Sequence, residues 1–491
     1  MALEQRTETA GPTGPSPAAT SATGATSASS PAAPPSKPRS RAGTTPRLLF
    51  LLGPAFVAAI AYVDPGNVAA NLTAGARYGY LLVWVLVAAN GMAMIIQYQS
   101  AKLGIVTGHS LPELLGGRMR KWSRRSFWVQ AELVAAATDL AEVIGGAIAL
   151  QLLFGLPLLL GGLIVGVISM AILAVQSRRG QRPFETVIMT LLAVIAVGFL
   201  AGLFVSPVDW GEAAGGLVPR FAGTDTVLLA AGMLGATVMP HAIYLHSSLA
   251  RDRHVAPSTP TTPIELRVSA GASPEHPHKL AARRAASADT AGNATELHGG
   301  RAPAGIRRLL HATKWDVLAA LILAGAVNIA MLLTAAANLG GVTGTDTIAG
   351  AHAAITAALG PTIGVIFAVG LLASGLASTS VGSYAGATIM AGLLRVRIPL
   401  LLRRVITLIP ALIILGAGVN PTWALVLSQV FLSLGIPFAL IPLIRLTSDR
   451  MLMGTFANRL PVRVLCWGVA VLIVALNLAL IGLTISGGLG G

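Results

Sequence analysis

The amino-acid sequence predicts an all-α protein that crosses a membrane many times. Of its residues, 54% are hydrophobic and only 11% are charged, and the mean hydropathy is +0.73. Soluble domains carry about 25% charged residues, so most of this chain cannot face water. The apolar residues form runs of roughly 20 residues, which is the length that a helix needs to cross a bilayer. The basic residues gather in alternate loops between these runs.

The apolar runs define eleven predicted transmembrane spans, numbered here in chain order. They cover 48–75, 80–105, 127–153, 156–176, 184–205, 226–249, 316–340, 361–393, 400–418, 421–446 and 464–487. Residues 1–45 are rich in Ala, Pro, Ser, Thr and Gly, and we expect a disordered cytoplasmic tail there. A second polar stretch, 251–305, is expected to be a disordered cytoplasmic loop. It separates spans 1–6 (46–250) from spans 7–11 (306–491).

The charges in the loops predict the orientation. Basic residues lie in the N-terminal tail and in five later segments, namely 118–125, 177–182, 251–314, 395–397 and 445–463. With eleven spans, all of these fall on one side, and the loops on the other side are Gly-rich and nearly free of Lys and Arg. By the positive-inside rule, the N-terminus is cytoplasmic and the C-terminus lies outside the cell membrane.

Composition and motifs exclude several classes of function. The net charge of +15 is explained by the basic cytoplasmic loops, and no basic segment is interleaved with aromatic residues as in nucleic-acid-binding proteins. The single cysteine, Cys466, excludes an intramolecular disulfide and any multi-cysteine metal centre. The sequence contains no nucleophile–base constellation and no phosphate-binding loop, so we expect neither an enzyme nor a prosthetic group.

The sequence AYVDPGNVAAN at 61–71 interrupts the first span with polar residues and helix breakers. Pro65 removes a backbone hydrogen bond and Gly66 weakens the helix, so the helix is expected to break there. Broken backbone at membrane depth is tolerated where it is buried in protein or lines a cavity. The break would expose carbonyls near Ala61, and Asp64 and Asn67 would add a carboxylate and an amide oxygen. The alternative is a proline kink whose aspartate forms a structural ion pair.

A second break is predicted in the sixth span, where the sequence reads ATVMPHAIYLH at 236–246. Pro240 would free carbonyls near Ala236, Met239 would supply a thioether, and His241 an imidazole. The alternative for Met239 is ordinary core packing. Two interrupted helices at corresponding places in two halves of a chain indicate a transporter built from inverted repeats, here spans 1–5 and 6–10.

The predicted ligands indicate a class of ion. Mg²⁺ and Ca²⁺ favour sites made of oxygen ligands alone, whereas a sulfur ligand favours softer transition metals. A carboxylate, an amide, backbone carbonyls and a thioether therefore predict a site for Mn²⁺, Fe²⁺ or a close relative.

Three carboxylates in the third span form a second candidate site. Glu132, Asp139 and Glu142 are separated by seven and three residues, so they share one helical face. Buried in a membrane, they must be hydrated, paired or protonated, which suits a proton relay. Ion pairs with Arg403 and Arg404 at the start of the ninth span are the structural alternative, and both roles are compatible.

Further polar residues interrupt later spans. Gln429 in the tenth span is either an additional metal ligand or a hydrogen-bonding link between helices. Asn328, Asn338 and the small-residue run 375–386 are expected to serve close helix packing.

Together, DPGN in the first span, ATVMPH in the sixth and TDLAEVIGGAIAL in the third closely resemble the NRAMP family of divalent-metal transporters, whose bacterial members are called MntH. The resemblance implies a LeuT-type fold and uptake of metal coupled to inward proton movement by alternating access. Mn²⁺ would be the main substrate, with Fe²⁺, Co²⁺ and Cd²⁺ as others. We expect a monomer whose partners are the metal ion, protons and the lipid bilayer, without nucleic acid.

The resemblance also implies residue roles. The implied metal ligands are Asp64, Asn67, Met239, the carbonyls of Ala61 and Ala236, and Gln429. The residues implied in proton transfer and gating are Asp139, Glu142, His241, Arg403, Arg404 and Glu132. Two positions depart from the family pattern: Ala242 stands where Asn is usual, and Leu376 where Gln is usual.

Two other functions remain as alternatives. A symporter of a small organic molecule on the same fold would have no use for the thioether. A metal-sensing receptor that signals through 251–305 should carry a foldable soluble domain, and this segment is too polar to form one.

Overall fold

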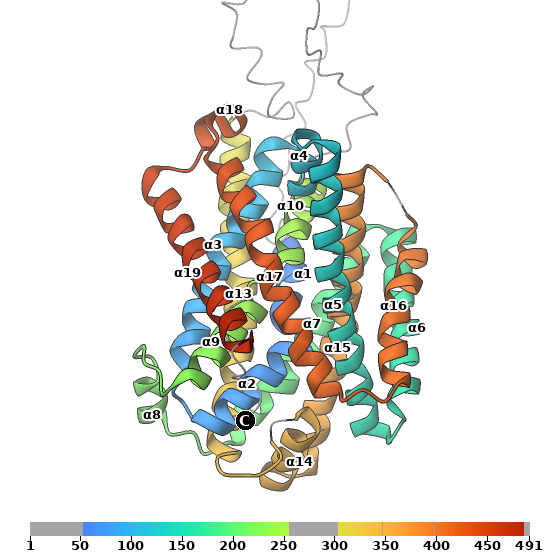
Figure 1. The fold of residues 1–491 in the computed structure, drawn as a ribbon, viewed down its shortest axis with the longest axis vertical. Coiled ribbons are helices and arrows are strands. Elements are labelled where there is room, and N and C mark those ends of the chain that lie inside the picture. The colour runs from blue at the N-terminus through green and yellow to red at the C-terminus, as the bar shows by residue number, and fades with distance from the viewer. Residues whose placement is uncertain (1–52, 255–302, 346, 397, 486–491) are drawn as a thin grey trace, which may run out of the picture. The chain divides into compact units, whose positions relative to one another are not determined.

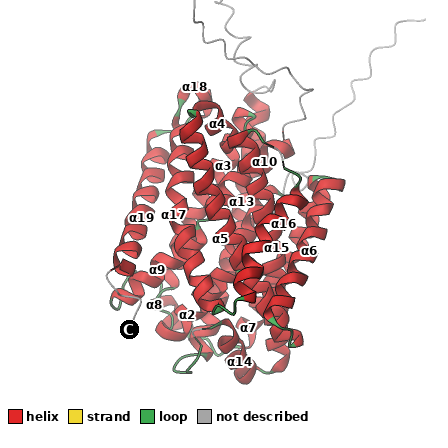
Figure 2. Ribbon diagram, turned by 45° about the vertical axis from the view of Figure 1, so that its right-hand side comes forward, coloured by secondary structure: helices red, strands yellow, loops and turns green. Residues whose placement is uncertain are grey.

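A computed structural model describes residues 53–254, 303–345, 347–396 and 398–485. Figure 2 shows that these residues form helices joined by loops, with no strand among them. The predicted tail at 1–45 lies outside the described residues, as does most of the predicted loop at 251–305. The two ends of that loop were predicted wrongly, because residues 251–254 and 303–305 are helical. Proline is favoured in the first turn of a helix, and Pro303 opens one here.

The helices follow one another along the chain as follows. They are α1 (Pro54–Ala59), the 3₁₀ turn η2 (Ile60–Tyr62), α2 (Pro65–Tyr78), α3 (Val83–Thr107), α4 (Leu111–Arg118), α5 (Lys121–Phe154), α6 (Leu158–Arg179), α7 (Gln181–Val205), α8 (Trp210–Gly215), α9 (Thr224–Thr237), α10 (Pro240–His254), α13 (Pro303–Asn338), α14 (Ile348–Leu359), α15 (Pro361–Leu394), α16 (Leu400–Gly416), α17 (Pro421–Ser448), α18 (Arg450–Met453), η3 (Gly454–Phe456) and α19 (Leu460–Ile485).

The predicted spans correspond to these helices. By length and composition, eight helical segments of the described chain can cross a membrane: α5, α6, α7, the α9–α10 pair, α13, α15, part of α17 and part of α19. The other three predicted spans coincide with the interrupted α1–η2–α2 segment, with α3 and with the shorter α16. The chain is therefore a multi-pass membrane protein, and the count of eleven crossings stays a prediction.

The two interrupted segments run in opposite directions through the bundle. In Figure 1, α1 lies above α2, whereas α9 lies below α10. Each segment thus enters from one side as a short helix, breaks, and leaves towards the other side as a second helix. This antiparallel relation is what an inverted repeat requires.

The long helices α5 and α15 pack closely against each other, and both contact the first interrupted segment. A Cβ added to Gly375 would lie 2.9 Å from the Glu142 carbonyl oxygen, and one added to Gly145 would overlap the ring of Pro65. Glycine at these positions lets helix backbones approach more closely than any other residue allows. The predicted packing role of the run 375–386 is therefore confirmed at Gly375.

Candidate metal-ion site

The first break lies between Tyr62 and Pro65. Pro65 has no N–H, so the Ala61 carbonyl loses the partner that it would have four residues later in an α-helix. Asp64 is extended (φ −77°, ψ 165°) and caps α2, and its carboxylate accepts hydrogen bonds from the backbone N–H of Asn67 at 3.0 Å and of Gly66 at 3.3 Å. Asp64 and Asn67 are both completely buried. The positive end of the α2 dipole therefore points at a buried carboxylate.

The second break repeats this arrangement. Pro240 starts α10 and deprives the carbonyl of Ala236, four residues earlier, of its α-helical partner. Val238 between the two helices is not helical (φ −100°, ψ 79°), and Met239 follows it with no exposed surface. Both prolines thus leave a carbonyl free of its helical hydrogen bond beside a buried polar or sulfur-containing side chain.

The two breaks meet through Asn67. Its Nδ2 donates to the Asp64 carboxylate at 2.5 Å and to the Ala236 carbonyl at 3.1 Å, so one amide spans both interruptions. The Oδ1 of Asn67 is buried and has no hydrogen-bond partner among the described residues. An unpartnered buried oxygen is costly unless something else binds it. The two interrupted segments lie about 170 positions apart in the sequence and were predicted to form one site. The hydrogen bond from Asn67 to the Ala236 carbonyl shows that they are in contact.

Gln429 of α17 lies beside the first break. A Cβ added to Gly66 would overlap the Gln429 amide, and the same amide lies near the Asp64 carboxylate. The glycine is therefore required for α17 to approach the break. Both of its amide atoms are buried without a standard hydrogen bond among the described residues. The two roles predicted for Gln429, an additional ligand or a link between helices, both stay predictions.

The carbonyls around the first break are held by side chains of neighbouring helices. Asn328 of α13 donates to the Tyr62 carbonyl at 2.7 Å, and Ser374 of α15 donates to the Val63 carbonyl at 2.5 Å. Asn71 donates to Asn328 at 2.7 Å. These residues fix the unwound backbone, a role that the sequence analysis missed for Ser374 and assigned to general packing for Asn328. The polar run within an apolar helix at 374–380 was the available signal.

Asn338, which was also assigned to packing, does join two helices. Its Nδ2 donates to the Ser206 hydroxyl at the end of α7 at 2.8 Å.

The donor set fits a divalent transition metal. It contains one carboxylate, one free amide oxygen, backbone carbonyls without helical partners and a buried thioether. The described residues contain no group of three or more His, Cys, Asp and Glu side chains arranged to hold a metal. A site with one carboxylate and otherwise neutral ligands suits an ion that must be released again, because one negative charge attracts the cation less strongly than several would.

The three carboxylates of α5 lie on one side of the candidate metal site and follow the helix away from it. Glu142 is completely buried, lies against Gly382 and is close enough to interact electrostatically with both Asp64 and Asp139. Neither of its carboxylate oxygens has a hydrogen-bond partner among the described residues. Glu142 is thus placed between the candidate metal site and the next acidic residue.

The other two carboxylates are paired, as the alternative interpretation predicted. Arg404 of α16, with no exposed surface, binds both oxygens of Asp139 at 2.5 Å and donates to Ser169 at 2.7 Å. Arg403 binds Glu132 at 2.5 Å. On the predicted helical face, the acidic residue nearest the candidate metal site, Glu142, is therefore unpaired within the described chain, and the two beyond it are each paired with an arginine.

Two of the histidines of α10, His241 and His246, are buried. Neither ring nitrogen of His241 has a hydrogen-bond partner in the described chain. His246 contacts the Gln97 amide oxygen at 2.8 Å, and Gln97 donates to the Tyr62 hydroxyl at 2.6 Å. The chain of contacts from His246 to Tyr62 was not predicted.

The two departures from the family pattern lie inside the protein. Ala242 has no exposed surface and follows His241 in α10, and Leu376 is 8% exposed in α15. Neither replaces a residue of the candidate ligand set.

Comparisons with known proteins agree with this description. The family model for natural resistance-associated macrophage protein-like (Nramp) proteins matches residues 55–483. The divalent metal cation transporter MntH of Mycobacterium tuberculosis (strain ATCC 25618 / H37Rv) is 54% identical over 438 residues, which are 89% of this chain and 92% of the relative. The MntH of Bacillus subtilis (strain 168) is 45% identical over 437 residues, with 88% and 92% covered.

Solved structures show the same fold. A manganese transporter of Eremococcus coleocola, crystallised with an aromatic bis-isothiourea substituted compound, superimposes with a TM-score of 0.74 at 30% identity, covering 90% of this chain and 88% of that one. MhsT in complex with L-phenylalanine gives a TM-score of 0.51 at 15% identity, covering 89% and 99%, and supports the LeuT-type fold alone.

Proposed function

This chain belongs to the Nramp family of metal-ion transporters, and on that premise we propose that it imports divalent transition-metal ions, Mn²⁺ foremost, together with protons. The observation that carries the proposal is the Asn67 amide, which joins the Asp64 carboxylate of one break to the Ala236 carbonyl of the other. Membership of this family indicates that the protein is a transporter and not an enzyme. The choice of ion and the coupling to protons are proposals.

We propose that the ion binds between the two breaks. Asp64, the Oδ1 of Asn67 and the Met239 thioether would be side-chain ligands, and the carbonyls of Ala61 and Ala236 would be backbone ligands. Gln429 would join them in conformations that bring α17 towards the first break, as its proximity to Gly66 supports. The sulfur ligand would disfavour Ca²⁺ and Mg²⁺ relative to Mn²⁺, Fe²⁺, Co²⁺ and Cd²⁺.

We propose that protons leave the metal site along α5. Glu142 would take a proton near Asp64 and pass it to Asp139, and the pairs Asp139–Arg404 and Glu132–Arg403 would carry it further. His241, buried without a hydrogen-bond partner among the described residues, is available to the same path. Buried ionisable residues in membrane helices are typical of such relays.

The proposed setting is the cell membrane, with the N-terminus in the cytoplasm and the C-terminus outside, as the loop charges predict. We propose that a monomer suffices, because the described part of one chain contains all the candidate ligands. Movement of the two interrupted segments would open the ion site to one side of the membrane and then to the other, as in other transporters built from inverted repeats.

The proposal is tested by reconstituting the protein in liposomes and measuring Mn²⁺ uptake with the outside acidic or neutral. We expect faster uptake at acidic external pH and metal-dependent acidification of the lumen, reported by a trapped pH-sensitive dye. Equal rates at both pH values without acidification would exclude proton symport. Uptake of none of the metals Mn²⁺, Fe²⁺, Co²⁺ and Cd²⁺ would exclude the metal proposal as a whole.

Met239→Ala is expected to relax ion selectivity. Removing the only sulfur ligand should lower the ratio of Mn²⁺ to Ca²⁺ uptake on the order of tenfold, which corresponds to about 1.4 kcal/mol of lost discrimination. Competition of Ca²⁺ against Mn²⁺ uptake measures this ratio. Met233→Ala is the matched control, because Met233 is also fully buried and lies on α9 but outside the site. A similar loss of selectivity in both variants would refute a ligand role.

Glu142→Gln is expected to separate metal movement from proton movement. The amide keeps the size of the side chain but cannot carry a proton, so the acceleration of Mn²⁺ uptake by external acid should disappear while Mn²⁺ binding remains. Calorimetric titration and the dye assay measure the two properties. Glu212→Gln on the exposed helix α8 serves as the control. Unchanged acid stimulation in Glu142→Gln would remove this residue from the proton path.

A further inference from the structure

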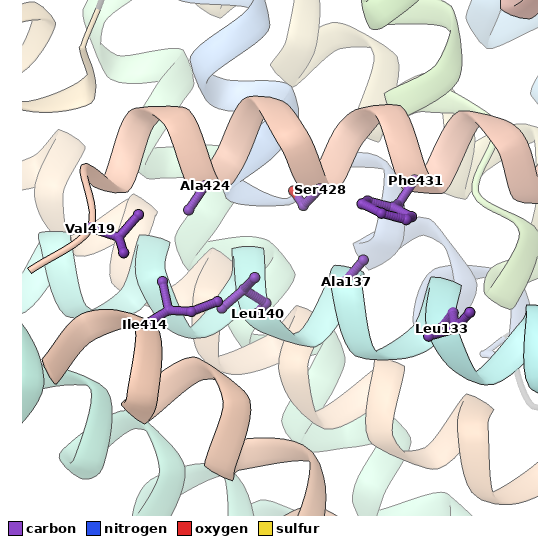
Figure 3. A pocket seen from close by; sticks show the side chains of 8 residues that line it. All are labelled: Leu133, Ala137, Leu140, Ile414, Val419, Ala424, Ser428 and Phe431. Atoms are coloured by element: carbon purple, nitrogen blue, oxygen red, sulfur yellow. The ribbon is translucent and has the colours of Figure 1, made fainter. Parts of the chain in front are cut away.

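A groove runs along the outer side of α5, between α5 and α17. It consists of two adjoining cavities of about 240 and about 550 Å³, which share Leu133 and Phe431 as lining residues. Figure 3 shows the smaller cavity, with Ala137 and Leu140 of α5 facing Ala424 and Phe431 of α17. None of the candidate metal ligands lines either cavity. The groove is therefore separate from the metal site.

The walls of the groove are apolar and exposed. Leu133 is 58% exposed, Phe431 44% and Phe438 45%. In a multi-pass membrane protein, such a surface faces the hydrocarbon chains of lipids. From Arg125 to Ala137 the groove follows about 18 Å of helix, at about 1.5 Å per residue. This is close to the depth of one leaflet, roughly half of the ~30 Å hydrocarbon core.

One end of the groove is basic and polar. Trp122, Arg125 and Ser126 line this end, and Arg120 and Lys121 precede them as exposed residues. The ion pairs found among the described residues include none of these three cations. Tryptophan and basic residues are typical of the membrane–water interface, and clusters of cations there attract anionic headgroups.

A second polar feature lies just inside this end. Gln130 lines the larger cavity, and its Oε1 is buried without a hydrogen-bond partner in the described chain. The side chain thus adds a polar group to the wall just inside the basic end. The groove thus combines cations, an interfacial tryptophan, a polar side chain and an apolar channel in that order along α5.

We propose that this groove binds an anionic phospholipid of the leaflet on the side of the basic loops. The phosphate would lie at Arg125 with Arg120 and Lys121 beside it, and one acyl chain would follow α5 down to Leu133 and Phe431. Charge complementarity at one end and the depth of the apolar channel identify the occupant as a lipid with a negative headgroup.

The position of the groove links this lipid to the transport machinery, a consequence that rests on the proposed function. One wall, α5, carries Glu142 on its inner face, and the other, α17, carries Gln429. The walls touch where Gly435 meets Val134: a Cβ on Gly435 would lie 2.6 Å from Val134 Cγ2 and 3.0 Å from Pro240 Cγ. A lipid that fills the groove supports the packing of α17 against α5 and the second break.

Native mass spectrometry of the detergent-purified full-length protein tests the site. The probes are phosphatidylglycerol and phosphatidylcholine with the same acyl chains. We expect retention of one phosphatidylglycerol per chain at concentrations on the order of tenfold lower than phosphatidylcholine. The triple variant Arg120→Gln/Lys121→Gln/Arg125→Gln should remove this preference. Ala137→Trp, which fills the apolar channel, should weaken binding of both lipids.

Two variants serve as controls. Arg307→Gln/Arg308→Gln removes cations from the start of α13, and Val197→Trp adds bulk at an exposed position of α7. Neither should change lipid retention. The proposal is overturned if the wild type retains both lipids equally, or if either control weakens binding as much as the groove variants do. Because the binding assay needs no metal, a failure of the proposed transport function would leave this result unaffected.

Discussion

Mn²⁺ uptake by the Asp64→Ala variant is expected to fall to the level of protein-free liposomes. Asp64 is the only carboxylate in the proposed metal site, and it is completely buried beside the free oxygen of Asn67. Its removal leaves neutral ligands that cannot replace the hydration shell of a divalent cation. Uptake of radioactive Mn²⁺ and calorimetric titration of Mn²⁺ measure the effect.

Asp64 also caps α2, so the loss of a ligand must be distinguished from the loss of a cap. Replacing an N-cap residue by Ala costs about 1 kcal/mol. Asp64→Asn keeps the capping oxygen and removes the charge, and it should abolish uptake as Ala does while staying closer to wild type in thermal stability. Asp209→Ala is the matched control, since Asp209 caps the exposed helix α8 through Gly211 and Glu212. Substantial uptake by Asp64→Ala would disprove the assigned site.

Arg404→Leu is expected to be the most destabilising single change in the acidic path. Arg404 and Asp139 are both almost completely buried, and the substitution leaves the Asp139 carboxylate without its counter-charge. Breaking a buried pair in this way costs about 3–5 kcal/mol. The midpoint of thermal unfolding in detergent and the yield of folded protein measure the loss.

Two further variants make this test specific. Arg118→Leu breaks the exposed pair with Asp449, which joins atoms 3.4 Å apart, and should cost at most about 1 kcal/mol. The double variant Arg404→Leu/Asp139→Leu removes both charges and should recover much of the stability without restoring proton-coupled uptake. If the double variant were as unstable as Arg404→Leu, packing rather than the unpaired charge would explain the loss.

Much of the site could be predicted because polar residues and prolines are conspicuous in apolar helices. The breaks at Pro65 and Pro240 follow from the missing N–H of proline, and their pairing follows from their matching places in two repeats. Ion pairs between the α5 carboxylates and Arg403 and Arg404 were also predicted, because buried charges need partners.

The contacts that hold the unwound backbone could not be predicted. Ser374 donates to the Val63 carbonyl from a position 311 residues further along the chain. A hydroxyl in a small-residue helix is equally compatible with helix packing, and only the distance between two helices decides where it donates. The short helices α4, α8 and α14 were missed for a related reason, since they lie in loops that hydropathy does not resolve.

The groove beside α5 could not be predicted, because it exists only where α5 and α17 are not packed against each other. Leu133 and Phe431 look like ordinary lipid-facing residues in sequence. That they line one channel depends on how far α5 and α17 separate, and the spacing of residues along a single helix does not contain this information.

The carbonyls of Ala61 and Ala236, which lack their helical hydrogen bonds, have a consequence for the genetics of this transporter. A backbone oxygen belongs to every residue alike, so a scan that replaces side chains cannot delete these two proposed ligands. Alanine already occupies both positions. Random mutagenesis for altered metal preference should therefore yield few changes at 61 and 236 and more at Pro65 and Pro240. Of the six proposed ligands, these two backbone oxygens would thus be under the genetic control of prolines that do not bind the ion.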